Sequence, residues 1–168
     1  DIDKLMARTA KRPIVTGVMS KTSATVFATI IGIISLLIFW MFTTPLAAFL
    51  ALIAISFYVF VYTMALKRRT SQNIVWGGAA GCMPVLIGWA AVTDSLSTTA
   101  LAFFMVIFFW TPPHFWALAI KYKDDYSAAG IPMLPVVATK ARVHKEMWFH
   151  TIMMIACSIW LIISAGLA

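Results

Sequence analysis

Long runs without charged residues dominate the chain. Residues 22–66 contain no Asp, Glu, Lys or Arg. As a single helix this run would reach about 68 Å, more than twice the membrane hydrocarbon thickness of about 30 Å. We therefore expect two spans, at about 23–42 and 46–66, joined by a turn at Thr43-Thr44-Pro45.

Three further apolar runs follow, at about 74–93, 99–120 and 147–168. Each is close to the roughly 20 residues that a transmembrane helix needs. The runs are continuous rather than alternating, which favours helices over the strands of a barrel. The pattern predicts an all-α, polytopic membrane helical bundle with five spans in a single domain, residues 1–168.

Composition supports a membrane protein. The chain is 62% hydrophobic and 11% charged, with a mean hydropathy of +0.92, whereas soluble domains are about a quarter charged. A 168-residue globule has too small an interior to bury so much apolar surface, so lipid must cover part of it. The net charge of +7 lies in loops between apolar runs. Because nucleic-acid binders carry a basic face, we expect membrane lipid and no nucleic acid as a partner.

The basic residues also predict the orientation. All Lys and Arg fall in residues 1–21, 67–69 and 121–145, and two spans separate each segment from the next. The loops 1–21, 67–73 and 121–146 therefore share one side, and Asp94 is the sole charge on the other. By the positive-inside rule the basic side faces the cytoplasm, or the matrix if the membrane is mitochondrial. We expect a bacterial or mitochondrial inner membrane.

The positive-inside rule does not place acidic residues, yet nearly all of them lie on the basic side. The first segment, DIDKLMARTAKRP, carries Asp1 and Asp3 followed by Arg8 and Arg12. This pattern suits a phosphate bridged by Mg²⁺, which takes one or two carboxylates, with arginine on the remaining oxygens. Solvated ion pairs or headgroup contacts are the alternative interpretation.

The second basic segment, YTMALKRRTSQN, leaves a span and brings four polar side chains to the membrane surface. These candidates for phosphate binding are Tyr62, Lys67, Arg68 and Asn73. A simple positive-inside anchor is the alternative explanation.

The third segment, WTPPHFWALAIKYKDDY, covers residues 110–126. At 100° per residue one helical face would carry a stripe of functional side chains from mid-membrane to the basic side. The members of this stripe are Trp110, His114, Lys121 and Asp125, with Asp124 close to it. Thr111-Pro112 is typical of an N-cap followed by proline, so we expect the helix to break and restart there.

His114 is expected to be buried within a span, where an ionisable group is a functional hypothesis. It could contact a substrate, ligate iron or act as a general base. Alternatively, its imidazole bonds a carbonyl that the prolines leave free. His150 lies nearer to a span end and is expected at the interface.

Two other features concern packing. Gly77 and Gly81 have the spacing that permits close helix contact. Cys82 and Cys157 are expected to be buried, unpaired thiols, since no metal-type cysteine spacing exists. The chain opens on polar DIDKLMART without a signal-peptide pattern, which indicates a piece of a longer protein.

Taken together, three segments resemble the UbiA-type intramembrane prenyltransferases, in order and spacing up to about residue 140. They are DIDKLMARTAKRP, YTMALKRRTSQNIVWGGAAGCMPVLIGW and WTPPHFWALAIKYKDDYSAAGIPMLPVV. The pieces WTPPHFWALAI and DYSAAGIPMLPVV are similar to the branch of heme O synthases. The resemblance implies nine spans around a central cavity, of which this chain would hold five, and two aspartate-rich motifs. Asp3 and Asp1 match acids of the first motif, and Asp125 matches the second.

The implied reaction transfers farnesyl from farnesyl diphosphate to a vinyl group of heme B, giving heme O and diphosphate. Mg²⁺ is the implied cofactor, held by Asp1, Asp3, Asp124 and Asp125. Asp3, Asp125 and Lys67 would be catalytic, and His114 and Trp110 would contact the heme. The implied diphosphate-binding residues are Arg8, Arg12, Tyr62, Lys67, Arg68, Asn73 and Lys121. Proteins of heme A and terminal oxidase assembly are conceivable handover partners.

Other classes of protein compete with this one. A transporter would account for a broken helix, but it predicts paired polar groups deeper in the spans. A heme-carrying electron-transfer subunit needs two axial ligands, whereas His114 and His150 are expected at different depths. Among prenyltransferases, the alternative acceptors are a quinone precursor or chlorophyllide.

Overall fold

The computed structural model describes residue 4 and residues 9–167. The predicted site residues Asp1, Asp3 and Arg8 lie outside this part of the chain. Five long apolar helices are present in it: α3 (Lys21–Phe42), α4 (Pro45–Ser56) with its π-helical continuation η1 (Phe57–Leu66), α5 (Asn73–Thr93), α6 (Thr98–Lys121) and α9 (Lys140–Ser164). The described residues contain no strand, which confirms the predicted all-α membrane fold.

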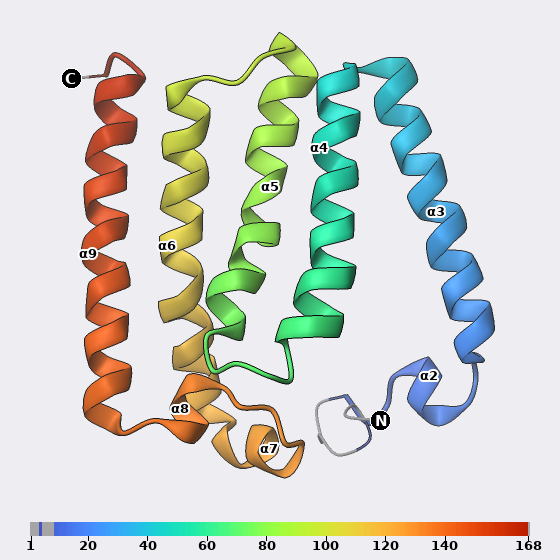
Figure 1. Ribbon diagram of the computed structural model, residues 1–168, viewed down its shortest axis with the longest axis vertical. Helices are drawn as coiled ribbons and strands as arrows, with labels where there is room; N and C mark the ends of the chain where they lie inside the picture. Colours follow the sequence, from blue (N-terminus) through green and yellow to red (C-terminus); the bar gives the residue numbers. More distant parts are fainter. Residues whose placement is uncertain (1–3, 5–8, 168) are drawn as a thin grey trace.

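The five spans form an open row (Figure 1). Each packs mainly on its neighbours in the sequence, in the order α3, α4, α5, α6 and α9. None of the residues of α3 is buried, and this helix packs mainly on α4 along one side. Within the described part of the chain the row does not close into a ring.

Short polar side chains begin four of these helices. The hydroxyl groups of Ser20, Thr44 and Ser97 accept hydrogen bonds from backbone N–H groups of the first turns of α3, α4 and α6. Thr139 does the same for α9. These N-caps satisfy donors that a helix leaves free at its start, which matters most where lipid offers no alternative partner.

Three short helices lie at one end of the row: α2 (Pro13–Thr16), α7 (Lys123–Ala128) and α8 (Leu134–Val137). The loop between η1 and α5 lies at the same end (Figure 1). All the described basic segments therefore gather at one end of the molecule. The turn at Thr43 and the loop after Asp94 lie at the other end.

The double proline does not break α6, contrary to our expectation from the sequence. The helix runs through Pro112 and Pro113, and Thr111 is not an N-cap. Instead, the Thr111 hydroxyl donates to the Ile107 carbonyl one turn earlier, at 2.8 Å. This bond inside the helix keeps a polar side chain satisfied at membrane depth.

The predicted stripe from Trp110 to Asp125 is also interrupted. α6 ends at Lys121 because Tyr122 adopts φ −109° and ψ 33°, outside the helical region. The chain then starts α7 in a new direction, so Asp125 does not continue the face of His114 and Lys121. At the other boundary, α9 begins at Lys140, well before the predicted start of the span at 147.

Two buried clusters join the spans, one built mainly from alanines and one around a tryptophan. Ala47 and Leu50 of α4 pack on Ala90 of α5. Trp116 of α6, Leu134 of α8 and Val143 of α9 form a second cluster near the basic end. Small side chains let helices approach closely in lipid, where hydrophobicity alone does not drive association.

The turn between the first two spans provides a test of this arrangement. Thr44 Oγ1 accepts from the Ala47 N–H at 3.1 Å and donates to the Ala90 carbonyl of α5 at 2.9 Å. Thr44→Ala removes both bonds and should lower the free energy of unfolding by about 1–2 kcal/mol. Denaturation of the intact protein in detergent would measure this loss.

Thr43→Ala is the matched control, because the Thr43 hydroxyl bonds only the Phe39 carbonyl of its own helix, at 2.7 Å. Equal losses of stability in the two variants would contradict a bridging role for Thr44.

Candidate functional site

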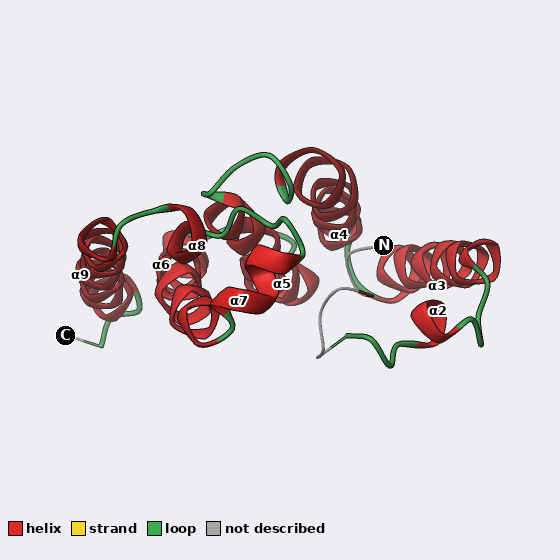
Figure 2. Ribbon diagram, turned by 90° about the horizontal axis from the view of Figure 1, so that it is seen from below, coloured by secondary structure: helices red, strands yellow, loops and turns green. Residues whose placement is uncertain are grey.

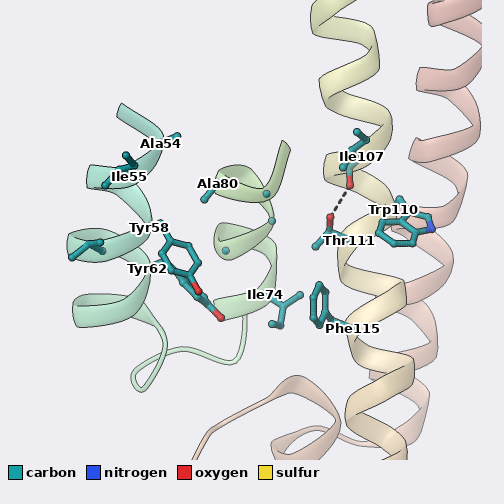
Figure 3. Close-up of a pocket in the computed structure, with 14 residues that line it drawn as sticks. Ala54, Ile55, Tyr58, Tyr62, Ile74, Ala80, Ile107, Trp110, Thr111 and Phe115 are labelled. Carbon is teal, nitrogen blue, oxygen red and sulfur yellow. Dashed lines mark hydrogen bonds between the residues drawn. The ribbon is translucent and has the colours of Figure 1, made fainter. Parts of the chain in front are cut away.

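A cavity of about 630 Å³ lies between α4 with η1, α5 and α6 (Figure 3). Its lining is mostly apolar and aromatic, with a few hydroxyl groups. The lining residues are Ala54, Ile55, Tyr58, Val59, Tyr62, Ile74, Gly77, Gly78, Ala80, Gly81, Ile107, Trp110, Thr111 and Phe115. Its size falls in the range of pockets that hold small organic ligands, about 300–1,000 Å³.

Glycines on α5 form one wall of this cavity. A Cβ atom on Gly77 would lie 2.6 Å from Cε2 of Tyr62, so the ring occupies the space that a side chain would fill. A Cβ on Gly78 would lie 3.1 Å from the Thr111 methyl group of α6. A Cβ on Gly81 would meet nothing within 4 Å. Gly77 and Gly78 therefore permit close approach, whereas Gly81 leaves the cavity open.

The π-helical segment η1 places two tyrosines at the cavity. Thr63 Oγ1 donates to the Tyr58 carbonyl at 2.7 Å, and the Lys67 N–H donates to the Tyr62 carbonyl at 2.8 Å; both bonds connect residues five apart. Tyr58 and Tyr62, four residues apart, share one face of this helix, with ring centroids 5.4 Å apart. Figure 3 shows both hydroxyl groups directed toward the basic end. Such segments occur often at functional sites.

Asn73 holds the loop that follows η1. Its amide nitrogen donates to the Lys67 carbonyl at 3.1 Å, and its side chain is only 1% exposed. The amide oxygen is buried without a hydrogen-bond partner in the described part of the chain. The buried amide thus fixes Lys67 next to Tyr62 rather than reaching the surface itself. Lys67 is partly buried, and Arg68 is exposed.

The short helix α7 brings the acidic pair to the same end. Asp124 is exposed and Asp125 half-buried in its first turn. Tyr126 packs against a buried cluster that includes Ile74, the second residue of α5 and itself part of the cavity lining. α7 consequently lies beneath the lower end of α5 (Figures 1 and 2). The contact joins the acidic segment to the segment that carries Lys67 and Asn73.

These acids fit a magnesium ion, although they do not complete a site. In the described residues no three His, Cys, Asp or Glu side chains cluster closely enough to hold a metal. Of the four predicted ligands only Asp124 and Asp125 are described. Two adjacent carboxylates match the preference of Mg²⁺ for one or two carboxylates, with water or phosphate oxygens as its other ligands.

The remaining predicted cations lie at the same end. Lys121 occupies the last turn of α6, with Nζ 5.4 Å from the centroid of the Tyr122 ring. Arg12 is exposed at the N-cap position of α2. Both residues belong to the segments at the basic end, as Lys67 does.

The sequence predicts that His114 is buried, but the structure shows it exposed. Its ring stacks on Trp110 with centroids 4.4 Å apart and meets Phe115 edge-on at 5.3 Å. Trp110 and Phe115 line the cavity, whereas His114 does not. No other described element covers the face of α6 that carries His114. The stacked pair therefore extends from the cavity to an open face of the row.

The buried histidine is instead His150, which the sequence predicts at the membrane interface. It is 5% exposed, and its Nδ1 lies 2.8 Å from the Glu146 carbonyl oxygen, which can only accept a hydrogen bond, so Nδ1 is the donor. The rings of Phe109 and Trp116 of α6 surround it. Its seven-residue spacing from Val143 and Cys157, also buried, marks the face of α9 that packs on α6.

Comparison with known proteins gives a family match over residues 1–168, to the UbiA prenyltransferase family. The chain belongs to the UbiA prenyltransferase family. This confirms the resemblance seen in the three sequence segments. Membership of this family favours an enzyme over the transporter and the heme-carrying subunit. No solved structure matches the chain.

Curated UbiA relatives of high identity are named protoheme IX farnesyltransferase. The chain is 52% identical over 166 residues to that of Mycolicibacterium smegmatis and 54% identical over 166 residues to that of Rhodococcus jostii. These alignments cover 99% of this chain and 54% and 55% of the relatives. Protoheme IX farnesyltransferase 1 of Saccharopolyspora erythraea is 56% identical over 162 residues, 96% of this chain and 52% of the relative. The chain thus spans about half the length of these relatives.

The glycine wall generates a prediction about Tyr62. Gly77→Ala places a methyl group where the ring now lies, so the ring must move away from α5. We expect faster nitration of Tyr62, mapped by mass spectrometry in the intact protein, and a loss of about 1–3 kcal/mol of stability from overpacking.

Gly81→Ala is the control, since its methyl group would meet nothing within 4 Å although Gly81 lines the same cavity. Unchanged nitration of Tyr62 in the Gly77→Ala protein would show that the close contact does not fix the ring.

Proposed function

We propose that the intact protein to which this chain belongs transfers a farnesyl group from farnesyl diphosphate to a vinyl group of protoheme IX. The products are heme O and diphosphate. One observation carries the proposal: an apolar cavity in a UbiA chain has Tyr62, Lys67 and the acidic turn of α7 gathered at its basic end. The relatives' shared name supports heme as the acceptor rather than a quinone precursor or chlorophyllide.

The two ends of farnesyl diphosphate match the two environments of the site. The isoprenoid chain is apolar and fits the cavity between η1, α5 and α6. The diphosphate carries several negative charges and belongs at the end where the cations gather. There Lys67, Arg68, Lys121 and Arg12 supply donors for its oxygens, and Tyr62 presents its hydroxyl group from the cavity wall. Asn73 acts through its bond to the Lys67 carbonyl.

Asp124 and Asp125 would hold a magnesium ion together with Asp1 and Asp3. When bound, Mg²⁺ supplies positive charge that stabilises the diphosphate oxygens. Asp125 lies in the first turn of α7, and Tyr126 beside it packs against the buried cluster that includes Ile74 of the cavity lining, which supports a metal ion near this end of the cavity.

Lys67 acts on the departure of diphosphate. As the allylic C–O bond breaks, its electron pair leaves with diphosphate, and the lysine cation stabilises the growing negative charge. The carbocation left behind lies among Tyr58, Tyr62 and Trp110, whose π faces attract positive charge.

The vinyl group of heme then forms the new C–C bond. Water adds to the resulting cation and loses a proton, which gives the hydroxyethylfarnesyl group. His114 and Trp110 form a stacked pair that extends from the cavity to the open face of α6, where a large planar acceptor has room to bind. We propose that this pair contacts the heme.

The cellular setting is part of the proposal. Five apolar helices and the family indicate an integral membrane protein. We propose a bacterial inner membrane, or the mitochondrial inner membrane, with the basic end in the cytoplasm or matrix. Proteins of heme A and terminal oxidase assembly would accept the product.

Asp125→Asn tests the proposed metal site. The substitution keeps the shape of the side chain but removes its charge, so heme O production should fall by at least about 100-fold. Mass spectrometry of the porphyrin products would measure this with the intact protein, Mg²⁺, heme B and farnesyl diphosphate.

The matched control is Asp94→Asn, at the opposite end of α5, where the left-handed φ of 47° suits asparagine. Membrane insertion should be normal in both variants. Full activity of the Asp125→Asn protein would remove this residue from the site.

His114→Ala tests the acceptor contact. Loss of the stacked imidazole should raise KM for heme by about tenfold, equivalent to about 1.4 kcal/mol, with little change in KM for farnesyl diphosphate. Steady-state kinetics with each substrate varied in turn would separate the two effects. An equal rise in both KM values would indicate general damage to α6 instead of a role in acceptor binding.

A further inference from the structure

A second cavity, of about 320 Å³, lies at the basic end between α6, α8 and the start of α9. It shares no lining residue with the first cavity. Its apolar part consists of Ile120, Pro135, Ala138 and Val143, and its polar groups are Lys123, Lys140 and His144. Neither the proposed reaction nor the family comparison uses these three residues.

Packing fixes the floor of this cavity. Val143 is 3% exposed and belongs to the cluster with Trp116 and Leu134, which are completely buried. Ala138 packs against the same cluster. The cavity therefore has a built base, and it is not merely a space between mobile side chains of the surface.

The charged groups around the cavity are all bases. Lys140 and His144 are four residues apart on α9 and so share one face of the helix. Lys123, the first residue of α7, also lines the cavity and comes from a different helix. Asp124, Asp125 and Glu146 do not contribute to the lining. A ligand that fills this space would meet cationic and hydrogen-bonding groups above an apolar floor.

The length of α9 and the position of Trp148 indicate where this cavity lies relative to the membrane surface. α9 has 25 residues and is about 37 Å long, which exceeds the hydrocarbon thickness of about 30 Å. Trp148 is 68% exposed one turn beyond His144, and exposed tryptophan is typical of the membrane–water interface. If Trp148 marks this boundary, Lys140 and His144, which precede it on α9, lie on its headgroup side.

We propose that this cavity is a binding site for the headgroup of an anionic phospholipid. Lys123 and Lys140 contact the phosphate, His144 forms a hydrogen bond to it, and Ile120 contacts the first carbons of an acyl chain. Basic pockets between helix ends on the positive side of a membrane recognise anionic lipids in this way. The apolar floor favours a lipid over free phosphate, which would leave that floor without a partner.

Binding of phosphatidylglycerol tests the proposal, with phosphatidylcholine as the zwitterionic comparison. Native mass spectrometry of the intact protein in detergent would measure both affinities. Lys123→Gln and Lys140→Gln should each weaken phosphatidylglycerol binding by about fivefold, since one lysine near a membrane surface contributes about 1 kcal/mol. Lys140→Arg should retain binding, and thermal midpoints would verify that each variant is folded.

Lys145→Gln is the matched control, because Lys145 is exposed next to His144 on α9 but does not line the cavity. It should leave the affinity for phosphatidylglycerol nearly unchanged. Equal weakening by Lys145→Gln and Lys140→Gln would mean diffuse attraction to the basic surface and would overturn the proposal. Displacement of the lipid by inorganic phosphate at comparable concentration would also overturn it, as the cavity would then take free phosphate.

Discussion

Hydrocarbon excludes unpaired charge, and this constraint decides where chemistry can occur in the chain. Every described Lys and Arg lies at one end of the row of helices or in the loops beside it. A charged substrate group must therefore meet the protein at that end, whereas the body of a ligand can extend into the apolar space between spans. The same constraint requires helices, since backbone groups find no other partner in lipid. A divided site, polar at its mouth and apolar in its depth, follows from this separation.

The depth of the site depends on small residues that keep helices at suitable distances. Gly77 admits the Tyr62 ring, Gly78 admits the Thr111 methyl group, and Gly81 leaves space unfilled. If α5 carried larger side chains at these positions, the ring of Tyr62 would have to leave the wall and the cavity would shrink. The absence of side chains at the glycines of α5 thus shapes the wall of the cavity. The aromatic and hydroxyl groups of the lining come from η1 and α6.

The sequence predicts some of these features well and others poorly, for physical reasons. The five spans follow from long apolar runs, which only membrane helices can accommodate. The π-helical turn of η1 was not predicted, because a change from four to five residues per hydrogen bond leaves the apolar pattern nearly unaltered. The end of α6 at Lys121 depends on the backbone of Tyr122, and the packing of Tyr126 against the cluster around Ile74 then joins α7 to α5. The helical periodicity of the sequence predicts neither the end of α6 nor the packing of α7.

The histidines show the limit of arguments from depth alone. His114 and His150 both lie within apolar helices, but packing, not depth, decides which is buried. His150 faces α6 on a stripe with Val143 and Cys157, where aromatic rings enclose it and the Glu146 carbonyl satisfies its Nδ1. His114 is exposed, with its ring stacked on a tryptophan of the cavity wall. In the proposed reaction the accessible imidazole is the useful one, because a group enclosed between α6 and α9 has no route to heme.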